Sequence, residues 1–130
     1  MMIDRDGRSD LHQAAFTGDV AWITLLAEEG LDVNLPDRDG FTPLHFAAQE
    51  WNVDAARALL DHGASVDPVN RHGNTPLFVA VFNSHGRGEL IVVLREFGAN
   101  PFKENGHGQT PVGLARLIGN YDIAQYFADL

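Results

Sequence analysis

The six histidines of this 130-residue chain are its most obvious candidates for acid–base chemistry or metal binding. None lies in an HExxH pattern, and none is paired with a carboxylate at the spacing that metal sites use. His72 and His107 occupy equivalent turns in different segments, so we expect that they do not converge on one ion. The sequence also lacks a GxSxG nucleophile motif and a glycine-rich loop followed by Lys-Ser/Thr. We therefore expect no enzyme, no cofactor and no metal site.

The net charge of the chain indicates which kinds of macromolecule it can bind. The chain has 18 acidic and 9 basic residues, which gives a formal net charge of -9. Nucleic acid is not an expected partner, because phosphate binding needs clustered cations. We expect a protein partner, and a basic one, because a negative body attracts positive charge at separations beyond a Debye length of about 8 Å.

Composition also bears on the compartment. The chain has no cysteine, no apolar stretch as long as a membrane span, and no basic start followed by a long apolar run. These features predict a cytoplasmic protein that does not associate with a membrane. The length and the hydrophobic content of 45% fit a single compact domain over residues 1–130.

The sequence repeats with a period of 33 residues, and this period determines which residues occupy equivalent positions. Turn glycines recur at Gly7, Gly40 and Gly73, 33 residues apart, and Gly108 follows after 35. The period predicts repeats at about 4–37, 38–70, 71–105 and 106–130. The two extra residues lie in the insertion Ser84–Gly88. We interpret the insertion as tolerated variation in loop length, and a functional loop is the alternative.

Each repeat is predicted to form a helical hairpin, and the second repeat shows the pattern most clearly. Thr42 is expected to cap a short helix that begins at Pro43, because the first helical N–H groups lack partners and proline has no N–H. A second helix resumes near Val53 and ends before Gly63. One hairpin alone cannot bury its apolar faces, so the repeats must stack.

Two groups of apolar residues test this stacking. Those of the second helix in the first repeat are all expected to face inward: Val20, Ile23, Leu25 and Leu26. Those near the other end are too many for one inner face: Leu117, Ile118, Tyr121, Tyr126 and Phe127. We expect part of that end to be exposed, so the chain is either a monomer or self-associates weakly through its fourth repeat.

The aligned segments SDLHQAA from Ser9, TPLHFAA from Thr42, TPLFVAV from Thr75 and TPVGLAR from Thr110 resemble the ankyrin-repeat family, over about residues 4–130. The resemblance implies an all-α solenoid of stacked helix-turn-helix units with projecting β-turns. It also implies that His45, matched by His12, forms hydrogen bonds that fix one repeat on the next.

The resemblance further implies that a protein partner binds to the turn tips and to a concave groove lined by the short helices. The candidate partner-binding residues are Arg5, Arg8, Phe16, Arg38, Phe41, Gln49, Glu50, Trp51, Arg71, His72, Asn74, Phe82, Asn83 and His107. Trp51 is expected to be partly exposed and to anchor the contact, and the alternative is that it packs on its own repeat. Arg5, Arg38 and Arg71 recur at one turn position, where they either contact the partner or only keep the turns soluble.

These features predict a protein–protein interaction module. One concrete version is an inhibitor or immunity-type protein that covers a basic partner. The alternative is a small-molecule or metal-binding protein, or an enzyme, that uses the histidine-containing turns. A stoichiometric macromolecular partner in a pull-down favours the module, whereas a thermal shift with a small molecule or a metal favours the alternative.

Overall fold

The computed structural model describes residues 3–119 and 121–130, so Met1, Met2 and Asn120 lie outside the description. Its helices are α1 (Asp10–Thr17), α2 (Val20–Glu28), α3 (Pro43–Gln49), α4 (Val53–Asp61), α5 (Pro76–Phe82), α6 (Glu89–Glu96), α7 (Pro111–Leu117) and the 3-10 helix η1 (Ile123–Phe127). No strand occurs among the described residues, which confirms the predicted all-α class.

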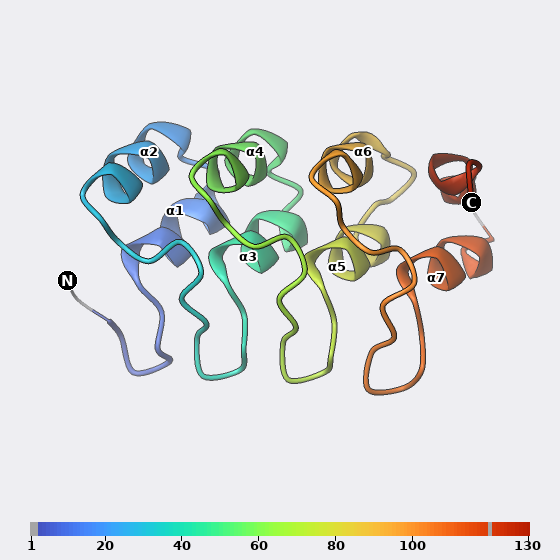
Figure 1. Cartoon of the computed structure of the whole chain (residues 1–130), viewed down its shortest axis with the longest axis horizontal. Helices are drawn as coiled ribbons and strands as arrows, with labels where there is room; N and C mark the ends of the chain where they lie inside the picture. The colour runs from blue at the N-terminus through green and yellow to red at the C-terminus, as the bar shows by residue number, and fades with distance from the viewer. Residues whose placement is uncertain (1–2, 120) are drawn as a thin grey trace.

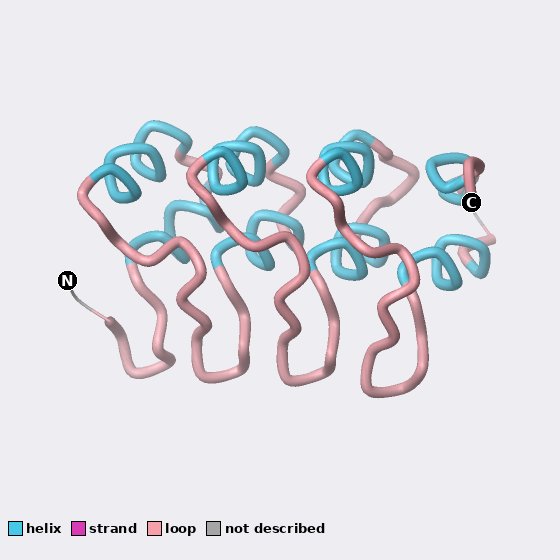
Figure 2. The backbone as a smooth tube through the Cα atoms, in the orientation of Figure 1, coloured by secondary structure: helices cyan, strands magenta, loops and turns pink. Residues whose placement is uncertain are grey.

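The helices form two parallel rows. Figure 1 shows α1, α3, α5 and α7 in an inner row, and α2, α4, α6 and η1 in an outer row above it. Figure 2 shows that the loops leading into the inner helices all project from one side of the stack. The fourth repeat differs from the others because its second helix is the short η1, and short runs of helix often adopt 3-10 geometry.

The inner helices begin where the sequence predicts. The hydroxyl of Thr42 accepts a hydrogen bond from the backbone N–H of His45 at 3.4 Å, and Thr75 and Thr110 cap α5 and α7 in the same way. A proline occupies the first position of α3, α5 and α7, where no N–H partner is needed. These local signals fix the start of each inner helix against the loop before it.

Equivalent leucines form the core between the rows. Leu44 and Leu77 stand at equivalent positions of α3 and α5, and Leu59 and Leu94 stand at equivalent positions of α4 and α6; all four are buried. All four side chains belong to one hydrophobic cluster that runs through the stack. Such burial contributes roughly 25 cal/mol for each Å² of apolar surface removed from water.

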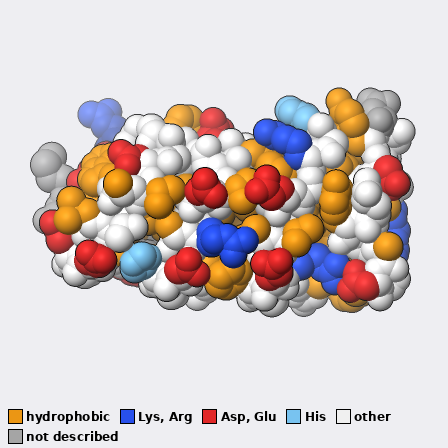
Figure 3. Space-filling model, turned by 90° about the horizontal axis from the view of Figure 1, so that it is seen from above, with side chains coloured by type: hydrophobic (Ala, Val, Ile, Leu, Met, Phe, Trp, Pro, Cys, Tyr) orange, Lys and Arg blue, Asp and Glu red, His pale blue; other side chains and the backbone are white. Residues whose placement is uncertain are grey.

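The expectation for α2 was only half right. Ile23 and Leu26 are buried, but Val20 is 36% exposed and Leu25 is 52% exposed. Helical geometry explains Leu25, because two residues advance the helix by about 200° and so place Leu25 opposite Ile23. Val20 is the first residue of the helix, where fewer neighbours cover it. Figure 3 shows the face made by the outer helices, where hydrophobic, acidic and basic side chains are mixed.

Four projecting loops, here called fingers, are each organised by one side chain at their base. The fingers comprise Asp4–Arg8, Asp37–Phe41, Asn70–Asn74 and Asn105–Gln109. In each finger, Oδ1 of the first residue accepts hydrogen bonds from the backbone N–H groups two and four residues later, at 2.8 to 3.1 Å. Asp and Asn serve equally because only an acceptor oxygen is required.

Backbone hydrogen bonds join each finger to the next. The N–H of Arg38 donates to the carbonyl of Asp6 at 2.8 Å, and Arg71 donates in the same way to Asp39. Gly106 donates to His72 at 2.9 Å. The fingers therefore form one connected row beside the inner helices.

Two buried histidines tie the fingers to the helices. Nδ1 of His12 and His45 accepts a hydrogen bond from the backbone N–H of Ser9 and Thr42, at 3.0 and 3.1 Å. Because Nδ1 is the acceptor, Nε2 carries the proton and donates to a backbone carbonyl of the next repeat. His12 reaches Phe41 at 2.9 Å and His45 reaches Asn74 at 2.8 Å. The predicted structural role of both histidines is confirmed.

The insertion Ser84–Gly88 packs against the fourth repeat. Ser84 is buried, and the rings of Tyr121 and Tyr126 lie directly over Gly86 and Gly88. A Cβ on Gly86 would lie 2.8 Å from the Tyr121 ring, so these glycines let the rings approach the loop backbone.

The apolar end of the chain is exposed only in part, as expected. Leu117 is 76% exposed and Tyr121 is 49% exposed, but Phe127 is buried. The guanidinium of Arg95 lies 5.4 Å from the Phe127 ring centre and also pairs with Asp129 at 2.6 Å. Phe127 therefore belongs to the core, and from residue 117 onward the exposed large apolar residues that the structure describes are Leu117, Tyr121 and Leu130.

Candidate functional site

A groove lies between the fingers and the inner helices, and two adjoining hollows form it. The first hollow, of about 830 Å³, lies at the first and second repeats. The second hollow, of about 470 Å³, extends from the second repeat to the fourth finger. Phe41 and Gln49 line both hollows, so the two adjoin one another.

Most of the residues that the sequence singled out surround this groove. Arg8, Phe16, Phe41 and Gln49 line the first hollow, while His72, Asn74, Phe82, Asn83 and His107 line the second together with Phe41 and Gln49. Phe16 is 44% exposed and Phe82 is 68% exposed, so both rings face solvent. The repeat alignment brought these residues together because equivalent positions of successive repeats lie side by side.

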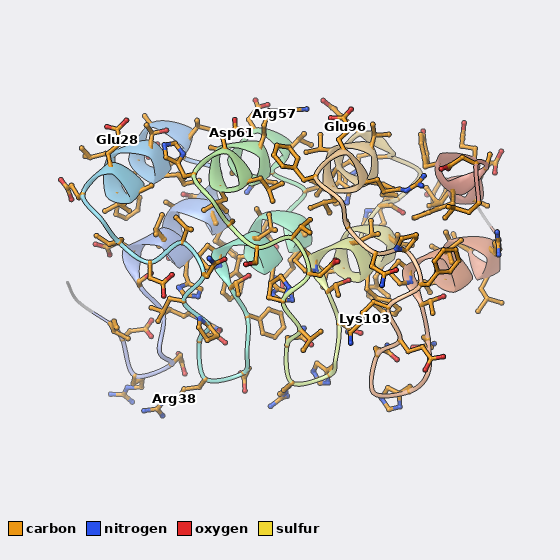
Figure 4. All side chains as sticks on the ribbon, viewed as in Figure 1. Glu28, Arg38, Arg57, Asp61, Glu96 and Lys103 are labelled. Carbon is orange, nitrogen blue, oxygen red and sulfur yellow. The ribbon has the colours of Figure 1, made fainter. Side chains whose placement is uncertain are left out.

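The recurring arginines do not line either hollow. Arg5, Arg38 and Arg71 are exposed at the fingers, and Figure 4 shows Arg38 at the tip of its loop, away from the helices. Arg71 forms an exposed ion pair with Asp39 at 3.2 Å. Glu50 is also outside the hollows and accepts a hydrogen bond from the side chain of Gln49 at 3.2 Å.

Trp51 is not the partly exposed anchor that the sequence predicted. Only 7% of the residue is exposed, because the third repeat and the insertion cover its ring. The indole Nε1 donates a hydrogen bond to the carbonyl of Ala80 at 3.0 Å, and Arg87 lies over the ring. The aromatic side chains that the groove presents are phenylalanines instead.

The first hollow has an aromatic wall. Phe41 stacks on Phe46 with ring centres 5.5 Å apart, and Phe16 meets Phe46 edge to face at 6.2 Å. The guanidinium of Arg8 lies 5.0 Å from the centre of the Phe46 ring and pairs with Asp37 at 3.2 Å. Stacked and edge-to-face arrangements are the geometries that aromatic pairs prefer, because the ring face is negative and the ring edge is positive.

Sequence reasoning missed several groove residues. Asp4 and Asp10 line the first hollow, and Asn70 and Asn105 line the second. The recurrence of Asp or Asn at the base of every finger was the available signal for three of them. Phe46 is only 7% exposed, but it also contributes to the wall of the first hollow.

Burial and hydrogen bonding perturb the protonation of groups around the first hollow. The backbone N–H of Arg8, together with that of Asp6, lowers the pKa of Asp4 below its ordinary value, so Asp4 is ionised at neutral pH. Burial lowers the pKa of His12 and lowers the pKa of His45 to about 4, so both imidazoles are neutral. The first hollow therefore presents carboxylates but no imidazolium.

Among residues 3–119 and 121–130, no group of three or more His, Cys, Asp or Glu side chains is placed to hold a metal ion. No helix within the described part of the chain has the length and apolar character needed to cross a membrane.

Comparison with known families agrees with the architecture. A family model described as ankyrin repeats, in three copies, matches residues 11–101. A comparison with curated proteins gave no match. The match covers α1 to α6, and the fourth finger and α7 continue the same stacking beyond it. The chain therefore belongs to the ankyrin-repeat family, whose members are generally protein–protein interaction modules and typically not enzymes.

Proposed function

We propose that this chain binds a protein partner in the groove between its fingers and its inner helices. The adjacency of the two hollows, which share Phe41 and Gln49 in their linings, supports this proposal most directly. Phe16 and Phe82 expose large apolar surfaces in the same groove, and aromatic side chains are enriched at the energetic centres of interfaces. The fingers are joined by backbone hydrogen bonds, so the groove is organised before any partner arrives.

The charge supports a basic partner. The net charge of -9 is spread over a small protein, and such a body speeds the approach of an oppositely charged molecule. We propose an inhibitor or immunity-type role, in which the chain covers a surface of that partner. The association rate should fall as salt rises from about 50 to 300 mM, because salt screens long-range attraction. An association rate that is independent of salt would remove the support for a basic partner.

The groove itself is tested by a matched pair of variants. Phe82 and Leu25 are both exposed apolar residues, but Phe82 lines the second hollow and Leu25 lies on the outer helix α2. A partner captured by the parent chain from the native host should be retained by Leu25→Glu and lost by Phe82→Glu. Both variants add the same negative charge, so a difference in binding between them reflects where the substituted residue lies on the surface.

The opposite pattern would identify a different binding face. If Phe82→Glu retains the partner and Leu25→Glu loses it, the outer helices form the interface. Thermal melting of both variants shows whether the fold is intact.

A further inference from the structure

We infer that the first hollow receives an arginine or lysine side chain from a partner segment that lies extended along the groove. This inference rests on the proposed function and adds the chemistry of the partner and its position in the groove. Three features of the described residues carry it: the charges of the first hollow, its aromatic wall, and the absence of formal charge in the second.

The carboxylates of the first hollow exceed its cations. Asp4, Asp10 and Arg8 are the acidic and basic residues that line it. Arg8 is already matched, because its guanidinium pairs with Asp37 at 3.2 Å and with Asp6 at 4.0 Å. Asp10 is exposed and forms no ion pair with any described residue. An incoming cation would therefore meet carboxylates that the chain itself leaves available.

The aromatic wall suits the same kind of side chain. The rings of Phe16 and Phe41 both pack against that of Phe46, and all three residues line the hollow. The stem of Arg or Lys buries apolar carbon atoms, and its charged head is attracted to the face of a ring. The chain uses this chemistry internally, since Arg8 lies over Phe46.

The second hollow has a different character. Its lining contains no Asp, Glu, Lys or Arg, and its polar groups are amides and two histidines. The amides come from Gln49, Asn70, Asn74, Asn83, Asn105 and Gln109. An amide side chain both donates and accepts hydrogen bonds, which matches the backbone of an extended segment. The contrast between the hollows places the basic side chain at the first and second repeats and an uncharged stretch beyond it.

A random peptide library tests the inference with the full chain. Displayed peptides of about 12 residues, long enough to span both hollows when extended, would be selected on the immobilised protein. We expect the selected peptides to share Arg or Lys at one position, with uncharged residues on one side of it. Replacing that Arg with citrulline, which has nearly the same shape but no charge, should weaken binding about tenfold.

The chain supplies a conservative charge-removing variant. Asn70 and Asn105 organise their fingers as Asp4 does, so Asp4→Asn keeps the acceptor oxygen and removes the charge. The double variant Asp4→Asn/Asp10→Asn should weaken the selected peptides about tenfold. The control Asp54→Asn/Asp61→Asn changes the net charge equally on the exposed face of α4 and should leave affinity within about twofold.

Each outcome bears on one of the two proposals. The inference is supported if the selected peptides share a fixed basic position, bind the control variant with normal affinity and bind the double variant with reduced affinity. Suppose instead that Phe82→Glu abolishes binding of the selected peptides, but the peptides share no basic position or bind the double variant with normal affinity. This result overturns the inference and leaves the groove as the binding site. Failure to select any peptide that Phe82→Glu weakens overturns the groove itself, and the inference with it.

Discussion

The guanidinium of Arg87 lies 4.5 Å from the centre of the Trp51 ring, so the insertion in the third repeat covers a side chain of the second. Arg87 is held there by its own backbone surroundings, because Nε donates to the carbonyl of Ser84 at 2.9 Å and Nη2 donates to that of Asn83 at 3.0 Å. Trp51 has a φ of 55°, a left-handed value that is unfavourable for a bulky residue. Burial of the indole offsets this cost.

Removing either partner of this contact should destabilise the fold by different amounts. Trp51→Ala should lower the free energy of unfolding by about 3 to 5 kcal/mol, because it empties a buried aromatic site. Arg87→Ala should lower it by about 1 kcal/mol through loss of the cation–π contact. Arg57→Ala is the control, since its pairing with Glu96 at 3.8 Å is exposed and should be worth less than about 0.5 kcal/mol.

Urea unfolding followed by far-UV circular dichroism gives all three values, and it does not depend on tryptophan fluorescence. If Arg87→Ala lowers the free energy of unfolding no more than Arg57→Ala does, the contact between Arg87 and Trp51 contributes no stability. The insertion is then only a change in loop length.

The architecture could be predicted from the sequence because its signals are local. A Thr-Pro pair starts an inner helix wherever it occurs, as at Thr42 and Thr75, and the turn glycines set the spacing of the hairpins. Equivalent positions of stacked repeats lie side by side, so much of the groove followed from the alignment alone.

The environment of single residues depended on segments distant in the sequence and was harder to predict. Trp51 is buried by Ala80 and Arg87, and nothing near Trp51 in the sequence announces them. Asp10 stands where the other three aligned segments have proline, and this position alone does not indicate that it lines the first hollow. The exposed position of Leu25 follows from the orientation of α2, which the number of apolar residues in that helix does not determine.

Leu59 should be among the more sensitive core positions. It is fully buried in α4, at the seam with neighbouring repeats, so Leu59→Ala should lower the free energy of unfolding by about 2 to 5 kcal/mol. Leu25→Ala makes the same chemical change on the exposed face of α2 and should cost less than about 1 kcal/mol. Equal losses in urea unfolding for the two variants would show that the stacked face is assigned wrongly.

The contact between the third and fourth fingers should depend on Gly73. Its φ is 77°, and a Cβ there would lie 2.7 Å from the backbone nitrogen of Gly106. Gly63 also has a positive φ, of 91°, but no atom lies within 4 Å of an added Cβ. Gly63→Ala should therefore cost about 1 kcal/mol for backbone strain alone, and Gly73→Ala should cost at least about 1 kcal/mol more.

Hydrogen exchange locates the effect of Gly73→Ala. The amide of Gly106 donates to the carbonyl of His72 at 2.9 Å, so it should exchange faster in Gly73→Ala than in Gly63→Ala. An unchanged exchange rate at Gly106 would mean that the fourth finger does not rely on this contact.

The buried histidines should make stability depend on pH. Burial lowers the pKa of His45 from 6.5 to about 4, so between these values the unfolded chain binds a proton that the folded chain does not. Stability is therefore complete above about pH 6.5 and decreases as the pH falls toward 4. The total loss from His45 is on the order of 3 kcal/mol, because each pKa unit corresponds to about 1.4 kcal/mol.

Carboxylates also titrate in this pH range, so the prediction concerns the difference between the pH dependence of the parent's free energy of unfolding and that of a variant. Phe78 occupies the position equivalent to His45 in the third repeat and is buried there, which makes His45→Phe the natural replacement. His45→Phe should be less stable at neutral pH because Thr42 and Asn74 lose their hydrogen-bond partners. Its free energy of unfolding should nevertheless fall less than that of the parent between pH 6.5 and 4. The exposed His107→Asn should follow the parent, and a His45→Phe curve parallel to the parent curve would show that His45 carries no pH dependence.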